Sequence, residues 1–205
     1  TISITNLNDN APVFTSSSTF SAAENQTSIG TVTASDADND SITFTISGSE
    51  IAITSAGVLS FISAPDYETK SSYTATVTAT DGANTATQDI TISITNLNDN
   101  APVFTSSSIF SAAENQTSIG TVTASDSDGD GIIYSISGID AAYISINSSS
   151  GFLAFTLTPD YEVKNSYSFI ATASDGANTA TQDITINITN LNDNAPVFTS
   201  SSIFS

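Results

Sequence analysis

The hexapeptide Asp-Asn-Ala-Pro-Val-Phe occurs three times in this chain, beginning at Asp9, Asp99 and Asp193. Residues 1–41 match residues 91–131 at 37 of 41 positions, and residues 81–111 differ from residues 175–205 at one position only. Self-similarity at a fixed long period indicates tandem structural units. We expect the end of a preceding repeat and its linker at 1–10, repeat 1 at 11–98, repeat 2 with its leading linker at 99–192, and the start of a following repeat at 193–205.

Apolar and polar side chains alternate with a period of two within each repeat. In residues 73–80 every second residue is threonine, and in residues 89–95 isoleucine alternates with polar residues. Such alternation in a chain rich in Thr, Ile and Val is typical of half-buried antiparallel strands. Turn signals delimit seven strands in repeat 1, expected at 13–23, 28–35, 42–47, 51–54, 58–62, 72–80 and 87–95. The sequence thus predicts an all-β chain of two tandem seven-stranded Greek-key β-sandwiches with an immunoglobulin-like shape.

The composition excludes several classes of function. The 205 residues contain 21 Asp and Glu against two Lys, and the resulting formal charge of −19 disfavours binding to a nucleic-acid backbone. There is no Cys, His, Met or Trp, which excludes disulfides, thiol chemistry, ordinary zinc sites and histidine-based acid–base catalysis. A nucleophilic serine would lack a base, so we expect no enzyme activity. The apolar runs are too short to span a membrane.

Most acidic residues lie in connections between the expected strands, and successive connections alternate between the two ends of each sandwich. If the first strand runs from an upper to a lower pole, the connections sort the carboxylates into four sets. Repeat 1 carries Glu24, Asp66 and Glu68 at its lower pole and Asp36, Asp38, Asp40 and Asp81 at its upper pole. Repeat 2 carries Glu114, Asp160 and Glu162 at its lower pole and Asp126, Asp128, Asp130 and Asp175 at its upper pole.

End-to-end stacking of the repeats would place the lower pole of repeat 1 against the upper pole of repeat 2. This junction would collect seven carboxylates and no cation: Glu24, Asp66, Glu68, Asp99, Asp126, Asp128 and Asp175. Their mutual repulsion requires a neutralising ion. Ca²⁺ takes oxygen ligands at six to eight positions, whereas Mg²⁺ favours a stricter octahedron with retained waters. We therefore expect bound Ca²⁺, with the linker 96–100 offering side-chain and carbonyl oxygens to both neighbours.

The linker and the acidic elements together resemble those of cadherin repeats. Asn96-Leu97-Asn98-Asp99-Asn100-Ala101-Pro102-Val103-Phe104 is similar to the cadherin linker D-x-N-D-N-x-P-x-F. Asp66-Tyr67-Glu68 resembles the D-R-E element, Asp36-Ala37-Asp38 and Asp126-Ser127-Asp128 resemble D-x-D, Glu24 and Glu114 match the single Glu, and Ala173-Ser174-Asp175-Gly176 matches A-x-D-x-G. The elements occur in the family's order across both repeats. The sequence departs from the family at the first linker position, which is Asn6, Asn96 or Asn190 where Asp is usual.

The resemblance implies three Ca²⁺ ions at each junction. By that analogy the two inner ions take Glu24, Asp66, Glu68, Asp99, the Asn96 carbonyl and Asp128, and the outer ion takes Asn98, the Asn100 carbonyl, Asp126, Asp128 and Asp175. Asp130, in the short segment after D-x-D, is a further candidate through a nearby carbonyl. At the two ends of the chain the candidates are Asn8, Asp9, Asn10, Asp36, Asp38 and Asp81 above repeat 1, and Glu114, Asp160, Glu162, Asn190 and Asp193 below repeat 2.

Two local motifs have other interpretations. Residues 126–131 are similar to the start of an EF-hand loop, but its twelfth position is Ser137 instead of Glu and strands are expected on both sides. An EF-hand is therefore not expected. Asn25-Gln26-Thr27 and Asn115-Gln116-Thr117 fit the N-glycosylation sequence, which arises often by chance in a chain so rich in Ser and Thr.

Two classes of function remain open. The first is a Ca²⁺-rigidified spacer in a large adhesion protein of the cell surface, whose partners are Ca²⁺ and neighbouring repeats of the same chain. Near-identical repeats without Cys favour a secreted bacterial adhesin, of the kind found in biofilms, over an animal cadherin. The second is a module that itself binds a ligand, through homophilic or carbohydrate contacts. Exposed Trp, which often supports both kinds of contact, is absent.

Overall fold

The structure, a computed structural model, describes residues 2, 3 and 5–199. The chain divides into two compact units, residues 1–97 and residues 98–205. Both units are built from strands, and the one helical segment of the described residues is the short 3₁₀ helix η1 (Ala141–Tyr143). The predicted all-β class and the sandwich architecture are confirmed.

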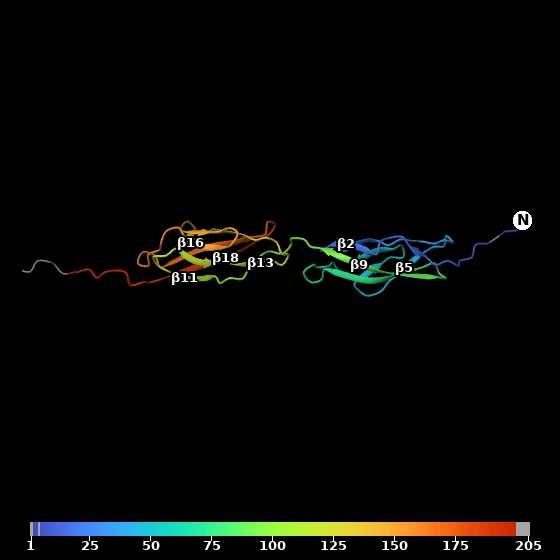
Figure 1. Cartoon of the computed structure of the whole chain (residues 1–205), viewed down its shortest axis with the longest axis horizontal. Coiled ribbons are helices and arrows are strands. Elements are labelled where there is room, and N and C mark those ends of the chain that lie inside the picture. Colours follow the sequence, from blue (N-terminus) through green and yellow to red (C-terminus); the bar gives the residue numbers. More distant parts are fainter. Residues whose placement is uncertain (1, 4, 200–205) are drawn as a thin grey trace, which may run out of the picture. The chain divides into compact units, whose positions relative to one another are not determined.

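Repeat 1 contains nine short or medium strands that form two facing sheets and a small ribbon (Figure 1). The strands are β1 (Val13–Phe14), β2 (Thr19–Ala23), β3 (Ser28–Thr31), β4 (Ala34–Ser35), β5 (Thr43–Ile46), β6 (Ile51–Ile53), β7 (Val58–Phe61), β8 (Ser72–Thr80) and β9 (Thr85–Thr95). One sheet has the order β2-β9-β8-β5, the other has the order β3-β7-β6, and β1 pairs with β4.

Repeat 2 has the same topology, with η1 inserted between β14 and β15. Its strands are β10 (Val103–Phe104), β11 (Ile109–Ala113), β12 (Ser118–Thr121), β13 (Ala124–Ser125), β14 (Ile133–Ser137), β15 (Ile144–Ile146), β16 (Phe152–Phe155), β17 (Ser166–Ser174) and β18 (Thr179–Thr189). The sheets are β11-β18-β17-β14 and β12-β16-β15, with β10 paired to β13.

The prediction of one continuous antiparallel strand at 13–23 is wrong. It is divided into β1 and β2, and β2 runs parallel to β9 with Thr19 opposite Thr91. The interruption falls on three consecutive serines, where Thr15 and Ser16 both donate their N–H to the Thr33 carbonyl at 2.8 and 3.3 Å. The predicted strand 28–35 is divided in the same way into β3 and β4. Short hydroxyl-bearing residues offer local hydrogen bonds that compete with a continuous ladder, which explains the break.

The core of each repeat lies between its two sheets and is formed by the inward residues of the alternating strands. In β9, Ile90, Ile92 and Ile94 are buried, while the residues between them are exposed. In β18, Ile184, Ile186 and Ile188 are buried in the same way. The alternation therefore separates an apolar interior from a hydroxyl-rich surface, and most of the charged residues lie in the loops between the strands.

A glycine is required at one turn of each core. Gly57 and Gly151 have positive φ angles of 86° and 71°. A Cβ atom at Gly57 would lie 2.2 Å from the Val32 carbonyl oxygen, and one at Gly151 would lie 2.1 Å from that of Val122. The close approach of two backbone segments excludes any side chain here and fixes the turn that precedes β7 and β16.

Candidate metal centre

A buried glutamate organises the lower pole of each repeat. Glu24 follows the end of β2 and is only 2% exposed. Its Oε2 accepts the backbone N–H of Tyr67 at 2.7 Å, and its Oε1 accepts that of Leu97 at 2.7 Å. Glu114 repeats the arrangement with Tyr161 and Leu191, at 2.9 and 2.6 Å. Hydrogen bonds to both oxygens stabilise an ionised carboxylate and tie three chain segments together.

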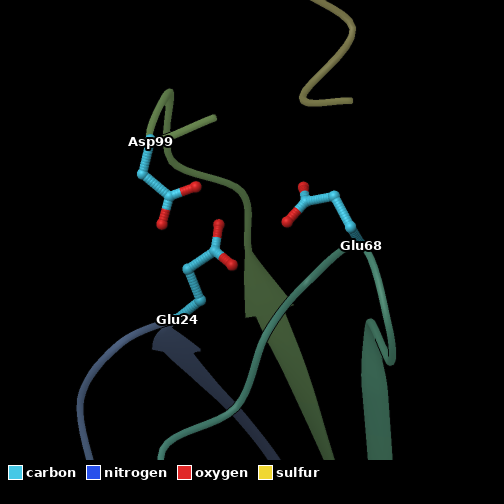
Figure 2. Close-up of side chains that lie close together, drawn as sticks. All are labelled: Glu24, Glu68 and Asp99. Atoms are coloured by element: carbon cyan, nitrogen blue, oxygen red, sulfur yellow. The ribbon is translucent and has the colours of Figure 1, made fainter. Parts of the chain in front are cut away.

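Two further carboxylates approach the buried glutamate. Glu24, Glu68 and Asp99 each have an oxygen within 4.8 Å of the others, and Figure 2 shows the three carboxylates turned toward one another. Glu68 lies in the segment after β7, and Asp99 lies in the linker that follows β9. The corresponding group Glu114, Glu162 and Asp193 meets the same distance limit. The predicted association of the single Glu, the second acidic residue of Asp-Tyr-Glu and the linker Asp is thus present in the geometry.

Asp66 and Asp160 lie at these poles but do not join the triads. Asp66 accepts the N–H of Thr69 at 3.1 Å on Oδ1 and the Thr69 hydroxyl at 3.0 Å on Oδ2. Asp160 accepts the N–H of Val163 at 3.2 Å. Each aspartate therefore stabilises the turn that carries the neighbouring glutamate. Asn190 contacts this group as well, because its Nδ2 donates to Glu162 Oε1 at 3.2 Å.

The upper poles contain a second kind of acidic cluster. Oxygens of Asp126, Asp128 and Asp130 lie within 4.8 Å of one another, as do those of Asp36, Asp38 and Asp40. Asp126 Oδ1 accepts the N–H groups of Asp128 and Asp130 at 3.0 and 3.3 Å. Its Oδ2 is buried and has no hydrogen-bond partner in the described part of the chain, and the same holds for Asp36 Oδ2. A buried carboxylate oxygen without a donor is costly, and a cation would remove that cost.

The middle aspartate of each cluster holds the preceding linker. Asp128 Oδ2 accepts the backbone N–H of Asp99 at 3.0 Å and that of Asn100 at 2.8 Å. In repeat 1, Asp38 Oδ2 accepts the N–H groups of Asp9 and Asn10 at 3.0 and 2.9 Å. These hydrogen bonds, led by the backbone N–H of Asn10, lower the pKa of Asp38.

The loop after β17 adds another carboxylate to the upper pole of repeat 2. Asp175 Oδ1 accepts the N–H groups of Ala177 and Asn178 at 2.7 and 2.6 Å, whereas its buried Oδ2 has no partner among the described residues. Burial alone would raise the pKa of Asp175, but the hydrogen bonds from Asn178 and Ala177 outweigh it and lower the pKa. In repeat 1 the N–H of Asn84 is the main cause of the lowered pKa of Asp81.

Three residues at the upper poles were not predicted as site residues from the sequence: Asn84, Asn178 and Asp40. Asn178 Nδ2 donates to Asn98 Oδ1 at 2.9 Å, and Asn84 Nδ2 donates to Asn8 Oδ1 at the same distance. These asparagines orient the linker amide so that its oxygen lies at the pole. The identical Asp-Gly-Ala-Asn at 81–84 and 175–178 is the sequence signal that could have identified them. The third is Asp40, the counterpart of Asp130, which was placed at the pole without a ligand role.

The segment that is similar to an EF-hand loop is flanked by β13 and β14. An EF-hand requires a helix on each side, so the expectation that this is no EF-hand is confirmed. Each pole instead presents carboxylate, amide and carbonyl oxygens from separate loops and offers no nitrogen or sulfur ligand. This donor set fits a hard cation with a high coordination number, such as Ca²⁺, better than zinc or a redox metal.

Comparison with known proteins identifies the family of these repeats. The family described as "Bacterial Ig domain" matches residues 8–93 and again residues 98–187. The chain belongs to this family. Its two bacterial Ig domains correspond to the two sequence repeats. The described part of the chain contains no helix with the length and apolar character needed to cross a membrane.

The two bacterial Ig domains are also similar to cadherin repeats, as the sequence motifs predicted. Human Protocadherin-11 X-linked is 33% identical over 220 residues, which cover 96% of this chain and 16% of that protein. Protein dachsous of Drosophila melanogaster is 30% identical over 225 residues, which cover 96% of this chain and 6% of that protein. The chain therefore spans at most about a sixth of these relatives.

Solved structures agree with this similarity. The crystal structure of mouse Cadherin-23 EC22-24 aligns with a TM-score of 0.77 and 25% identity over 90% of this chain and 68% of that chain. The protocadherin gammaB7 EC3-6 cis-dimer structure aligns with a TM-score of 0.75 and 26% identity over 96% of this chain and 54% of that chain. The resemblance to tandem cadherin repeats is thus confirmed in sequence and in fold.

Proposed function

We propose that the chain is a calcium-binding tandem repeat that serves as a Ca²⁺-rigidified spacer or adhesion rod in a cell-surface protein. The observation that supports this most strongly is the pair of buried oxygens, Asp36 Oδ2 and Asp126 Oδ2, that have no donor among the described residues. In both aspartates the other oxygen is held by two backbone N–H groups. The partnerless oxygen therefore has a fixed position, as a ligand for a cation requires.

The proposed ligands form two types of set around each linker. The inner type consists of the buried glutamate, Asp-x-Glu and the linker aspartate, which for the middle linker are Glu24, Asp66, Glu68 and Asp99 with the Asn96 carbonyl. The outer type consists of Asn98, the Asn100 carbonyl, Asp126, Asp128 and Asp175, with Asp130 beside them. The sets at the chain's two ends are Asn8, Asp9, Asn10, Asp36, Asp38 and Asp81 in repeat 1, and Glu114, Asp160, Glu162, Asn190 and Asp193 in repeat 2.

The electrostatic balance supports the same proposal. The chain has two lysines, and both pair with acidic residues away from the triads: Lys70 with Glu50, and Lys164 with Asp140. No lysine or arginine is therefore left to neutralise the acidic clusters at the poles of the two repeats. A divalent ion bound by three carboxylates removes their mutual repulsion and shields each from the others.

The relatives support a spacer role outside the cell. Similar solved chains are named as ectodomains or extracellular cadherin domains. The near-identity of the two repeats in this chain suits a rod built from equivalent units. The absence of Cys is compatible with a secreted protein that does not depend on disulfides.

Calorimetric titration of Ca²⁺ into the chelated protein tests the binding proposal. We expect saturable binding with dissociation constants of about 10⁻⁴ to 10⁻³ M, the range of extracellular Ca²⁺ modules. Because an ion bound only by the folded state adds to its stability, the melting temperature should rise with Ca²⁺ concentration. A flat titration together with an unchanged melting temperature would refute the proposal.

Small-angle X-ray scattering tests the spacer role separately. With saturating Ca²⁺ we expect the maximum dimension of an extended two-repeat rod, and after addition of EDTA we expect a broader distribution with shorter average dimensions. Each sandwich should stay folded in EDTA, because its core does not involve the acidic poles. Equal scattering profiles in both conditions would show that the ions bind without stiffening the linker.

Self-association is a second candidate function. The protocadherin gammaB7 chain that resembles this one was solved as a cis-dimer. Light scattering after size exclusion, with and without Ca²⁺, distinguishes the two: a spacer remains a monomer at all concentrations, whereas a homophilic module shows a mass that rises with protein concentration. A glycan array would test carbohydrate binding in the same preparations.

A further inference from the structure

The asparagine that follows the buried glutamate has an unusual backbone conformation in both repeats. Asn25 and Asn115 have φ angles of 62° and 65°, in the left-handed region that residues other than glycine rarely adopt. Both lie in the connection that leads from the first sheet into β3 or β12. Asparagine is among the few non-glycine residues that tolerate this conformation, so the position is open to Asn, Asp and Gly.

Asn115 contacts two segments of the lower pole at once. Its backbone N–H donates to the Pro159 carbonyl at 3.0 Å, immediately before Asp160. Its side-chain Nδ2 donates to Asp193 Oδ2 in the linker. The left-handed backbone turns the side chain of Asn115 toward the linker, while the preceding Glu114 accepts the N–H of Leu191. One dipeptide thus holds both the linker backbone and its carboxylate.

The second oxygen of the linker aspartate is also held. Asn194 Nδ2 donates to Asp193 Oδ1 at 3.1 Å. The carboxylate is therefore oriented by amide donors on both oxygens, and each oxygen keeps lone pairs for a further ligand. A donor that fixes the rotation of a ligating carboxylate in this way acts like the hydrogen-bond partners that surround other metal ligands.

We propose that Asn115, and Asn25 at the equivalent position of repeat 1, is a positioning residue for the linker aspartate of the Ca²⁺ site. The inference rests on the proposed function, because it assigns a role toward Ca²⁺ to a residue that supplies no ligand atom. Asn25 shares the left-handed backbone and donates its N–H to Pro65 at 3.0 Å. Asn25 lies 74 residues before Asp99, and Asn115 lies 78 residues before Asp193, because repeat 2 is four residues longer than repeat 1.

The side-chain Nδ2 atom also bears on whether Asn25 and Asn115 are N-glycosylated. Nδ2 of the first asparagine in Asn-x-Thr is the atom that would carry an N-linked glycan. In Asn115 this atom donates to Asp193, and a glycan there would displace the linker from the pole. The positioning role therefore excludes modification, and Asn25 and Asn115 should stay unmodified even when the protein is made in a host that glycosylates.

The test compares three Asn→Gly changes in the full chain. The variants N25G and N115G remove the amide but keep a residue that adopts positive φ without strain. The matched control is N39G, because Asn39 also has a positive φ of 63° and its counterpart in repeat 2 is already Gly129. Ca²⁺ affinity is measured by calorimetry, and melting temperature is measured in EDTA and in Ca²⁺.

We expect N25G and N115G to weaken Ca²⁺ binding about tenfold, the usual effect of removing a group that orients a metal ligand, and N39G to change it less than twofold. The melting temperature of N25G and N115G should fall more in Ca²⁺ than in EDTA. An equal fall in both conditions with unchanged affinity would show a purely structural role and overturn the inference. If the unaltered protein binds no Ca²⁺, the proposed function fails first and this inference fails with it. A glycan at Asn25 or Asn115, found by peptide mapping, would contradict it independently.

Discussion

Glu114 offers the sharpest test of how a buried carboxylate stabilises a repeat in the absence of metal. It is 2% exposed and accepts two backbone N–H groups, at 2.9 Å from Tyr161 and 2.6 Å from Leu191. In E114Q the side chain keeps its shape but loses the charge, and its NH₂ group must face one of these N–H donors. One acceptor is therefore lost and one backbone N–H remains buried without a partner.

The magnitude follows from these two hydrogen bonds. A hydrogen bond to a charged group contributes about 1.5–3 kcal/mol, and conversion of the remaining one to a neutral bond costs roughly a further 0.5–1 kcal/mol. Loss of the charge also removes its repulsion from Glu162 and Asp193, which offsets about 1 kcal/mol of this cost. We therefore expect E114Q to lower the free energy of unfolding of repeat 2 by about 1–3 kcal/mol. For a domain of this size that corresponds to a fall in melting temperature of about 5–20 °C.

The assay is differential scanning calorimetry in EDTA, which removes any contribution from metal binding. The transition of repeat 2 should shift while that of repeat 1 stays in place. The control is E50Q, because Glu50 is 56% exposed and its pair with Lys70 lies at the surface, where an ion pair contributes about 0–1 kcal/mol. An E114Q protein that melts within about 2 °C of the unaltered protein would refute the assignment of Glu114 as the organiser of the pole.

Three other predictions concern separate features of the two repeats. In the Ca²⁺ titration, D128A should weaken binding more than D130A, because Asp128 also holds the linker backbone, and equal losses would show that its role is misassigned. In urea denaturation, G151A should destabilise repeat 2 by at least about 2 kcal/mol, because the new Cβ would lie 2.1 Å from the Val122 carbonyl oxygen and φ is 71°. The control G131A should leave the stability nearly unchanged, because a Cβ there would have no atom within 4 Å. The lowered pKa of Asp81 contributes stability that is complete above the unfolded value near pH 4 and is lost as pH falls through the folded pKa. D81N should therefore flatten the acid side of the stability–pH curve and lower the stability by a constant amount from pH 5 to 8, where a chain without His has little to titrate.

The strand pattern was predictable because burial in this protein follows the alternation of side chains closely. β8 and β9 begin and end within two residues of the expected strands, since apolar residues alternate with threonine or other polar residues along both. The division of the first strand was not predictable from alternation. Only the hydrogen bonds of Thr15 and Ser16 to the Thr33 carbonyl show where the chain leaves one sheet for the other.

The acidic poles were predictable as groups but not in detail. Strand order alone places Glu24 and Glu68 at one end of repeat 1 and Asp36 and Asp38 at the other. The sequence could not show that Asp66 caps its own turn through Thr69, because that depends on the side-chain rotamer.

The asparagines were missed for a related reason. Asn84, Asn115 and Asn178 contribute through amide donors, whereas a metal-binding motif in a sequence consists of residues that supply oxygen ligands. Their positions are set by the local backbone: a positive φ at Asn115, and a tight turn closed by the side chain of Asp175 before Asn178.

The central claim is that the acidic poles bind Ca²⁺, and the most direct measurement is a crystal structure of this chain grown in millimolar Ca²⁺. We expect ions with six to eight oxygen ligands at the middle linker, bound by Glu24, Glu68 and Asp99 and by Asp126, Asp128 and Asp175, with fewer ions at the two ends of the chain. Electron density that shows full end sites and an empty middle linker, or ions only at lattice contacts, would contradict it.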